Sequence, residues 1–268
     1  MINNVDYHII DKCNLNCASC NHFSPLFTGD NRGKSINQIT ADLNLLSKVS
    51  DGFEVLTLLG GEPTLHPQLS NILGIARSIF PKKEIHLVTN GTKYDKFDRW
   101  KDALMSNNIV VYVSLYPYCS DYMERLQKIK QTLEPEVRIE YVDYPTDCGF
   151  NYGFLTNRDD IVTNEELKYC ERPFNCCQLK NGKLYLCNFA AQFDVLKRFF
   201  SDKITFDLDG KECFDLNGNV TLKDLESFIV YANPNICRHC LDIHNGGTNA
   251  PTRKWAITKK DIEEWVID

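Results

Sequence analysis

Short apolar runs alternate with amphipathic stretches along the first half of the chain. The runs at residues 5–10, 53–59, 84–89, 109–115 and 137–142 have the length and β-branched content of buried strands. Between them, apolar residues recur at helical spacing, which predicts helices over 36–46, 69–80, 100–105 and 122–133. This order predicts right-handed βαβ units around a parallel sheet, where ligands bind at the carboxyl ends of the strands.

The pattern changes after about residue 144. An Asn181-Gly182 pair predicts a hairpin turn between strands at 174–179 and 184–187. Thr221 is placed to cap a helix over 222–231. A strand-like stretch at 255–258 precedes an expected closing helix at 259–266. We therefore expect a barrel-like domain over residues 1–148 and a smaller C-terminal domain over 149–268.

Composition narrows the function classes. The net charge of −6 disfavours a nucleic-acid or anionic-membrane partner, and no apolar run is long enough to span a bilayer. The N-terminal residues lack the basic start and apolar stretch of a signal peptide, so we expect a cytoplasmic protein. Cytosolic thiols stay reduced, so the twelve cysteines are better candidates for metal ligands than for disulfides.

Cys13, Cys17 and Cys20 form a tight group directly after the first predicted strand. Three thiolates are one ligand short of a closed structural zinc site. They suit a four-iron cluster in which one iron stays open to a cofactor or substrate. His22 offers an alternative, because it could complete a zinc site with the three cysteines.

The C-x3-C-x2-C spacing after a first strand resembles the signature of the radical S-adenosylmethionine (SAM) superfamily. The resemblance implies a partial (β/α)6 TIM-like barrel whose [4Fe-4S] cluster binds SAM through its open iron. An electron from the reduced cluster would then cleave SAM to methionine and a 5′-deoxyadenosyl radical. That radical would abstract a hydrogen atom from an unactivated carbon, while the protein positions the reactants and excludes water.

Two further motifs stand at the ends of the next predicted strands. Gly60-Gly61-Glu62-Pro63 resembles the GGEP motif of that superfamily, with Glu62 or nearby carbonyls accepting from the SAM ammonium. Thr89-Asn90 ends the third strand, where the family places polar groups for ribose or carboxylate. Ser114 on the fourth strand is a weaker candidate of the same kind. Taken singly, these segments could also be ordinary glycine turns and a buried hydroxyl.

One position departs from the family. The residue before the third cysteine is usually aromatic and lies near the SAM adenine, but here it is Ser19. The resemblance then leaves His22 or Phe23 to pack against the adenine.

The second cysteine group resembles the Twitch extension, a shortened SPASM-type domain that holds an auxiliary [4Fe-4S] cluster. Its expected ligands lie on both sides of a Gly182 hairpin turn and in a later C-x2-C pair: Cys170, Cys187, Cys237 and Cys240. Cys176 or Cys177 could replace Cys170 as the first ligand. Four thiolates also suit structural zinc.

Three functions follow from these resemblances. In size and cysteine layout the chain resembles Twitch-bearing inosamine dehydrogenases, which favours oxidation of a sugar- or cyclitol-like small molecule. Asp143, at the end of the fifth strand, is the candidate base for this reaction. Epimerisation or cross-linking of a ribosomally made peptide is the alternative enzyme function, and a zinc-stabilised binding module is the alternative without redox chemistry. The family implies a flavodoxin or ferredoxin as electron donor.

Overall fold

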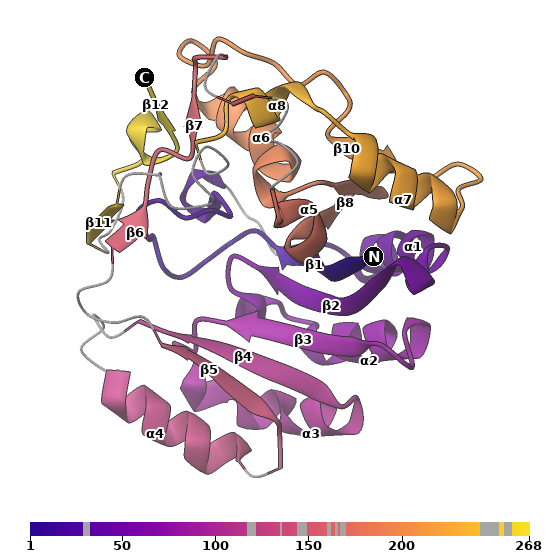
Figure 1. The fold of residues 1–268 in the computed structure, drawn as a ribbon. Coiled ribbons are helices and arrows are strands. Elements are labelled where there is room, and N and C mark those ends of the chain that lie inside the picture. Colours follow the sequence, from indigo (N-terminus) through magenta and orange to yellow (C-terminus); the bar gives the residue numbers. More distant parts are fainter. Residues whose placement is uncertain are drawn as a thin grey trace.

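The computed structural model describes residues 1–28, 33–116, 122–134, 136–143, 149–159, 162–163, 166, 170–241, 252–254 and 259–268. Its centre is an eight-stranded sheet with the order β10-β9-β8-β1-β2-β3-β4-β5 (Figure 1). The strands are β1 (Ile2–Ile10), β2 (Phe53–Gly60), β3 (Glu84–Thr89), β4 (Ile109–Leu115), β5 (Ile139–Asp143), β8 (Cys177–Lys180), β9 (Lys183–Tyr185) and β10 (Cys213–Asp215). Neighbours from β8 through β1 to β5 pair in parallel, whereas β8–β9 and β9–β10 pair antiparallel.

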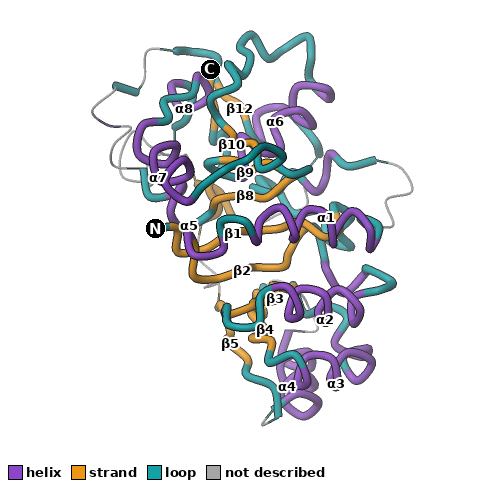
Figure 2. The backbone as a smooth tube through the Cα atoms, turned by 90° about the vertical axis from the view of Figure 1, so that its right-hand side faces the viewer, coloured by secondary structure: helices purple, strands orange, loops and turns teal. Residues whose placement is uncertain are grey.

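Four helices cover one face of this sheet, as Figure 2 shows along its right-hand side. They are α1 (Ile36–Ser47), α2 (Leu69–Ile79), α3 (Asp98–Ser106) and α4 (Tyr122–Leu133). Ser35 caps α1 by accepting a hydrogen bond from the Gln38 backbone N–H. The apolar stripes of these helices and the facing strand residues form one continuous buried core. The predicted parallel α/β sheet is therefore confirmed.

Side chains alternate along β1, as expected of a strand. Val5, Tyr7 and Ile9 are fully buried in the core under the helices. Asp6 and the intervening polar residues point to the other face of the sheet, where the Asn4 amide donates to the Asp6 carboxyl at 2.7 Å. Burial raises the pKa of Asp6 from 3.8 to about 7. The inner face of the partial barrel therefore carries polar groups where the outer face carries the core.

The sixth parallel strand, β8, lies beside β1, on the side of the sheet away from β5. β8 comes from the C-terminal part of the chain but pairs with β1, so the sheet runs across the predicted domain boundary. The hairpin between β8 and β9 is confirmed, with Asn181 at φ 52° and Gly182 at φ 72°. Positive φ at both positions belongs to a type I′ turn, which explains the Asn-Gly pair. The Gly182 N–H donates to Asp42 of α1 at 2.8 Å, which docks the hairpin against the helices.

Much of the C-terminal half packs around a second buried cluster rich in phenylalanine. The helices of this half are α5 (Arg172–Asn175), α6 (Asn188–Phe199), α7 (Leu222–Tyr231) and α8 (Asn235–Arg238), of which α7 packs through Leu225 against the first core. Its small sheets pair β6 (Gly149–Asn151) with β11 (Thr252–Lys254) and β7 (Leu155–Thr156) with β12 (Val266–Ile267). Short 3-10 helices lie at Ser24–Leu26, Ser50–Gly52, Pro63–Leu65, Tyr94–Lys96 and Ile262–Glu264.

Several predicted elements differ from the structure. The predicted closing helix over 259–266 is wrong: a 3-10 turn and strand β12 occupy that segment, because the Glu264 and Trp265 carbonyls accept from the Gly153 and Leu155 N–H groups instead of continuing a helix. The first hairpin strand begins at Cys177, since residues 172–175 form α5. Thr221 does cap α7, in a capping box with Asp224. The strand predicted at 255–258 lies outside the described residues. Within the described part of the chain, no helix is long and apolar enough to cross a membrane.

Candidate active site and second cysteine site

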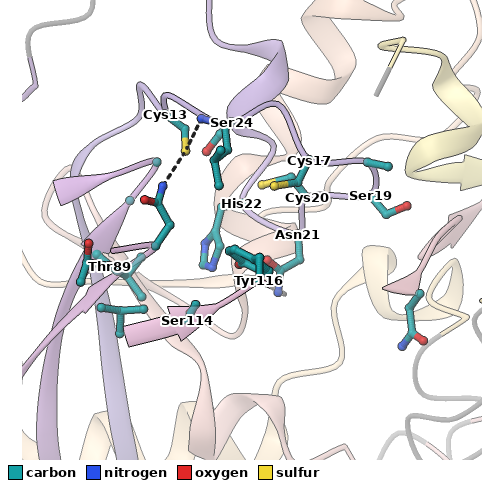
Figure 3. A pocket seen from close by; sticks show the side chains of 18 of the residues that line it. Cys13, Cys17, Ser19, Cys20, Asn21, His22, Ser24, Thr89, Ser114 and Tyr116 are labelled. Atoms are coloured by element: carbon teal, nitrogen blue, oxygen red, sulfur yellow. Dashed lines mark hydrogen bonds between the residues drawn. The ribbon is translucent and has the colours of Figure 1, made fainter. Parts of the chain in front are cut away.

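A pocket of about 450 Å³ opens at the carboxyl ends of the parallel strands. Cys13, Cys17 and Cys20 all line it, on the loop that follows β1. Figure 3 shows the three cysteines at the pocket, with Thr89 and Ser114 below them in this view. The structure therefore brings the first cysteine group to the sheet edge where ligands of parallel sheets bind.

The start of the cysteine loop is held by the backbone of the glycine motif. The Gly61 N–H donates to the Ile10 carbonyl at 2.8 Å, and the Glu62 N–H donates to the Lys12 carbonyl at 2.9 Å. A Cβ added at Gly60, where φ is +152°, would overlap the Ile10 carbonyl oxygen. The two glycines line the pocket, and they also let two loop backbones approach each other.

Glu62 and Pro63 do not line this pocket. The Glu62 side chain is fully buried and accepts four hydrogen bonds from the protein. Its Oε1 accepts from the backbone N–H and hydroxyl of Thr64 at 3.0 and 2.6 Å and from the Thr89 hydroxyl at 2.7 Å. Its Oε2 accepts from the Asn90 N–H at 2.8 Å. Glu62 therefore ties the glycine motif to the end of β3; of the two groups expected to accept from the SAM ammonium, Glu62 or nearby carbonyls, the carboxylate is the one already engaged by protein donors.

The polar residues at the ends of β3 and β4 face the pocket as predicted. Thr89, Asn90 and Ser114 all line it. The Asn90 side-chain amide also donates to Asn14 at 3.1 Å and lies 3.7 Å from the Cys13 sulfur. An amide at this place can hydrogen-bond a metal-bound thiolate, an interaction that tunes iron–sulfur clusters.

Of Ser19 and the two candidates for adenine contact, His22 and Phe23, two residues line the pocket. Ser19 and His22 do, whereas Phe23 is fully buried in the C-terminal core against Phe189 and Trp265. The His22 Nδ1 lies 2.8 Å from the His8 Nε2. Burial lowers the pKa of His22 to about 3, so the ring is neutral. Sequence patterns did not single out Tyr116, Asn151 and Phe154, which also line the pocket.

Burial raises the pKa of the Cys13 thiol to about 12, and the neighbouring Glu62, Cys20 and Cys17 add to this effect. The same cause raises the pKa of Cys20. Within the described residues, no three His, Cys, Asp or Glu side chains converge as ligands of a single ion. A four-iron cluster needs a different arrangement, because each thiolate binds a different iron. Three soft thiolates around an otherwise uncharged pocket fit such a cluster, whose binding would displace the thiol protons.

The second cysteine group comes together from three separate segments. Around a small cavity of about 20 Å³ lie the four expected ligands, Cys170, Cys187, Cys237 and Cys240. Burial raises the pKa of Cys237, and the three other thiols raise it further.

The two alternative first ligands lie elsewhere. Cys177 is fully buried in β8, where its thiol donates to the Tyr185 carbonyl at 3.0 Å. Burial raises the pKa of Cys176 to about 11, and nearby Asp6, Cys187 and Cys170 add to this effect, but Cys176 does not line the cavity. Asp143 ends β5, and its side chain lies outside the described residues.

Comparison with known proteins decides the family. The model of the radical SAM superfamily matches residues 7–157, more than half of the chain. The chain belongs to the radical SAM superfamily. Membership implies one [4Fe-4S] cluster and SAM as cofactors. The matched range includes the segment that carries Cys13, Cys17 and Cys20.

The relatives by sequence match only part of this chain, and this chain matches only part of each relative. The GTP 3′,8-cyclase of Klebsiella pneumoniae subsp. pneumoniae is 30% identical over 98 residues, and that of Nostoc sp. is 31% identical over 103 residues. The match spans 29% of the length of each cyclase and 35% or 34% of this chain. The crystal structure of BtrN in complex with AdoMet and 2-DOIA superposes with a TM-score of 0.55 at 15% identity, covering 94% of this chain and 99% of BtrN. At that identity the likeness establishes a shared fold.

Proposed function

We propose that this radical SAM enzyme oxidises a neutral, hydroxyl-rich small molecule of the sugar or cyclitol class, with an auxiliary [4Fe-4S] cluster as electron acceptor. The SAM cluster would bind Cys13, Cys17 and Cys20, and the auxiliary cluster would bind Cys170, Cys187, Cys237 and Cys240. We call the pocket lined by Cys13, Cys17 and Cys20 the SAM pocket. The observation that carries this proposal is that four cysteines, from segments up to 70 residues apart, meet around a second cavity beside it.

A fourth thiolate changes what a cluster can do. Three protein ligands leave one iron open for SAM, whereas four protein ligands close the cluster to exogenous ligands. A closed cluster is suited to accept or pass electrons. Arg172 also lines the second cavity, where its positive charge would favour a cluster carrying an added electron.

The two sites lie on opposite sides of one short segment. Phe154 lines the SAM pocket, and the next residue, Leu155, lines the second cavity. Leu155 also forms an antiparallel bridge with Cys240. Because Phe154 and Leu155 are consecutive, one short segment contributes to the walls of both sites. This arrangement would allow an electron to pass from a substrate radical to the second site over a short path.

The lining of the SAM pocket favours a neutral polar substrate. Its polar side chains include Asn21, His22, Ser114, Tyr116 and Asn151, all of which can hydrogen-bond hydroxyl groups. Among the described residues that line it, none is an Asp, Glu, Lys or Arg. A nucleoside triphosphate such as GTP is normally held by cationic side chains, so the lining does not favour the substrate named for the cyclases.

The reaction would remove two electrons and two protons from a carbinol. SAM, held at the cluster of Cys13, Cys17 and Cys20, would supply the radical chemistry that takes the carbinol hydrogen atom, with one electron from a flavodoxin or ferredoxin. The chain must then hold the substrate hydroxyl, accept its proton and pass the second electron to the auxiliary site. Asp143 remains the proposed base, since β5 ends at the same edge of the sheet as the pocket.

Metal counting tests the two-cluster part of the proposal. We expect about eight irons in the reconstituted protein, and about four in both a Cys13→Ala/Cys17→Ala/Cys20→Ala and a Cys237→Ala/Cys240→Ala variant. Cys213→Ala, which changes a thiol outside both groups, is the matched control and should keep the full count. About four irons together with one zinc that is lost from the Cys237→Ala/Cys240→Ala variant would make the second site structural.

Product analysis tests the oxidation. The protein, SAM and a reductant would be incubated without oxygen with a panel of cyclitols, aminocyclitols and free sugars. We expect a product two mass units lighter than its substrate, formed one-for-one with 5′-deoxyadenosine. A panel that never stimulates 5′-deoxyadenosine, while a peptide does, would reject the small-molecule class. No 5′-deoxyadenosine at all from protein with a full iron count would reject SAM cleavage at this site.

A further inference from the structure

The last turn of the chain grips the cysteine loop. This C-terminal turn comprises residues 262–267, which include the 3-10 helix Ile262–Glu264 and strand β12. Within it Glu264 and Trp265 are 4% and 0% exposed. The Glu264 Oε2 accepts a hydrogen bond from the Ser19 backbone N–H at 2.7 Å. The Trp265 Nε1 donates to the Cys20 carbonyl at 2.8 Å. Two consecutive C-terminal residues therefore bond two consecutive residues of the SAM-cluster loop.

The held part of the loop has an unfavourable backbone conformation. Ser19 has φ 56° and Phe23 has φ 58°, in the left-handed region that residues other than glycine seldom adopt. Such conformations persist when surrounding contacts impose them. Figure 3 shows Ser19 beyond Cys17 and Cys20, at the side of the pocket. At Ser19 the backbone N–H is held by the hydrogen bond to the buried Glu264.

The C-terminal turn is itself fixed to the wall between the two cysteine sites. The Gly153 N–H donates to the Glu264 carbonyl at 3.1 Å, and the Leu155 N–H donates to the Trp265 carbonyl at 2.8 Å. The Trp265 ring stacks on Phe23, with ring centroids 5.8 Å apart and planes 27° apart. These contacts make the turn a bridge from the segment that carries Phe154 to the cysteine loop.

We propose that Glu264 is a positioning residue for the SAM cluster, and that the C-terminal turn acts as a latch on Ser19 and Cys20. By holding the Ser19 N–H, Glu264 keeps the loop in the left-handed turn that presents the Cys20 thiol to the pocket. Ser19 is also the position at which this chain departs from the aromatic residue usual in the family. It concerns the cluster that family membership implies, and it does not depend on the proposed oxidation.

The test compares Glu264→Ala, Glu264→Gln and a matched control, Glu263→Ala, whose side chain lies next to Glu264 but is exposed. Each full-length variant would be reconstituted and followed for iron release to a chelator and for the electron paramagnetic resonance signal that responds to SAM. We expect Glu264→Ala to lose the SAM-responsive cluster about tenfold faster than the wild type, because a buried hydrogen bond to the loop is gone. Glu264→Gln should restore most of the lifetime, since its amide oxygen can still accept from Ser19.

Wild-type release and an unchanged signal in Glu264→Ala would overturn the proposal, as would equal losses in Glu264→Ala and Glu263→Ala. If Glu264→Ala fails to fold, Trp265→Phe provides the second test. It keeps an aromatic ring against Phe23 but removes the N–H that bonds the Cys20 carbonyl. An altered SAM-responsive signal in a folded Trp265→Phe protein is expected, and a wild-type signal and lifetime would refute the latch.

Discussion

Replacing Glu62 by alanine should disconnect the glycine motif from strand β3. The buried carboxyl group accepts from two backbone N–H groups, those of Thr64 and Asn90, and from the hydroxyls of Thr64 and Thr89. Burial raises the pKa of Glu62, while these donors act to lower it. In the alanine variant both hydroxyls can turn to other acceptors, but the two N–H groups are fixed by the backbone.

The magnitude follows from those two N–H groups. A buried donor left without a partner costs about 1–3 kcal/mol, so we expect Glu62→Ala to lower the free energy of unfolding by about 4 kcal/mol. In Glu62→Gln a single amide oxygen replaces two carboxyl oxygens, and its NH2 group must face at least one of the donors. We expect about 2 kcal/mol for that variant, half of the alanine effect.

Urea unfolding of the apoprotein measures the change in the free energy of unfolding. Equilibrium binding of SAM to the reconstituted enzyme shows whether the affinity for the cofactor changes as well. The control is Glu54→Ala, which changes an exposed residue of β2, the strand that precedes the glycine motif. It should change neither the free energy of unfolding nor the affinity for SAM. A loss of SAM affinity without loss of stability would show that Glu62 contacts the cofactor directly. An unfolding free energy within about 1 kcal/mol of the wild type would refute the four-donor account itself.

Three further outcomes are expected. Gly60→Ala should prevent the three N-terminal cysteines from holding iron, measured as iron per chain, because its Cβ would overlap the Ile10 carbonyl; full iron content would contradict this. Asn90→Ala removes a donor 3.7 Å from the Cys13 sulfur and should make the SAM cluster harder to reduce, as a more negative midpoint in a redox titration; an unchanged midpoint would contradict this. Asp6→Asn should stabilise the apoprotein more at pH 8.5 than at pH 5 in urea unfolding. The folded protein keeps the Asp6 proton up to about pH 7, whereas the unfolded chain releases it near pH 3.8, so the stability cost grows as the pH rises through that interval and reaches about 4 kcal/mol above it. Equal stabilisation at both pH values would contradict the buried-carboxyl reasoning.

Local patterns along the chain predicted the parallel half of the fold well. Helix α4 has the predicted bounds, and the Asn181-Gly182 turn has the expected positive φ values. Both features depend on neighbouring residues only. The pairing of β8 with β1 could not be predicted in this way, because strand order is set by contacts between residues more than 150 positions apart.

In the candidate site, too, the features set by neighbouring residues could be predicted and those set by distant contacts could not. The spacing of the N-terminal cysteines identified the first group, because all three stand on one loop. Glu62 also bonds partners that its motif did not indicate, since Thr89 and Asn90 become its neighbours only when β2 and β3 pair. The segment at 259–266 has apolar residues at near-helical spacing, yet its carbonyls bond Gly153 and Leu155. Tertiary hydrogen bonds outweigh helix propensity there.

The short segment from Gly153 to Thr156 links the two cysteine groups and the C-terminal turn. Phe154 faces the SAM pocket and its carbonyl accepts from the Leu241 N–H, next to Cys240. Leu155 lines the second cavity, and its N–H bonds the Trp265 carbonyl, whose indole in turn holds Cys20. A displacement of this segment must therefore move the walls of both sites together. Loss of the SAM cluster should consequently alter the spectroscopic signal of the proposed auxiliary cluster, which independent sites would not do.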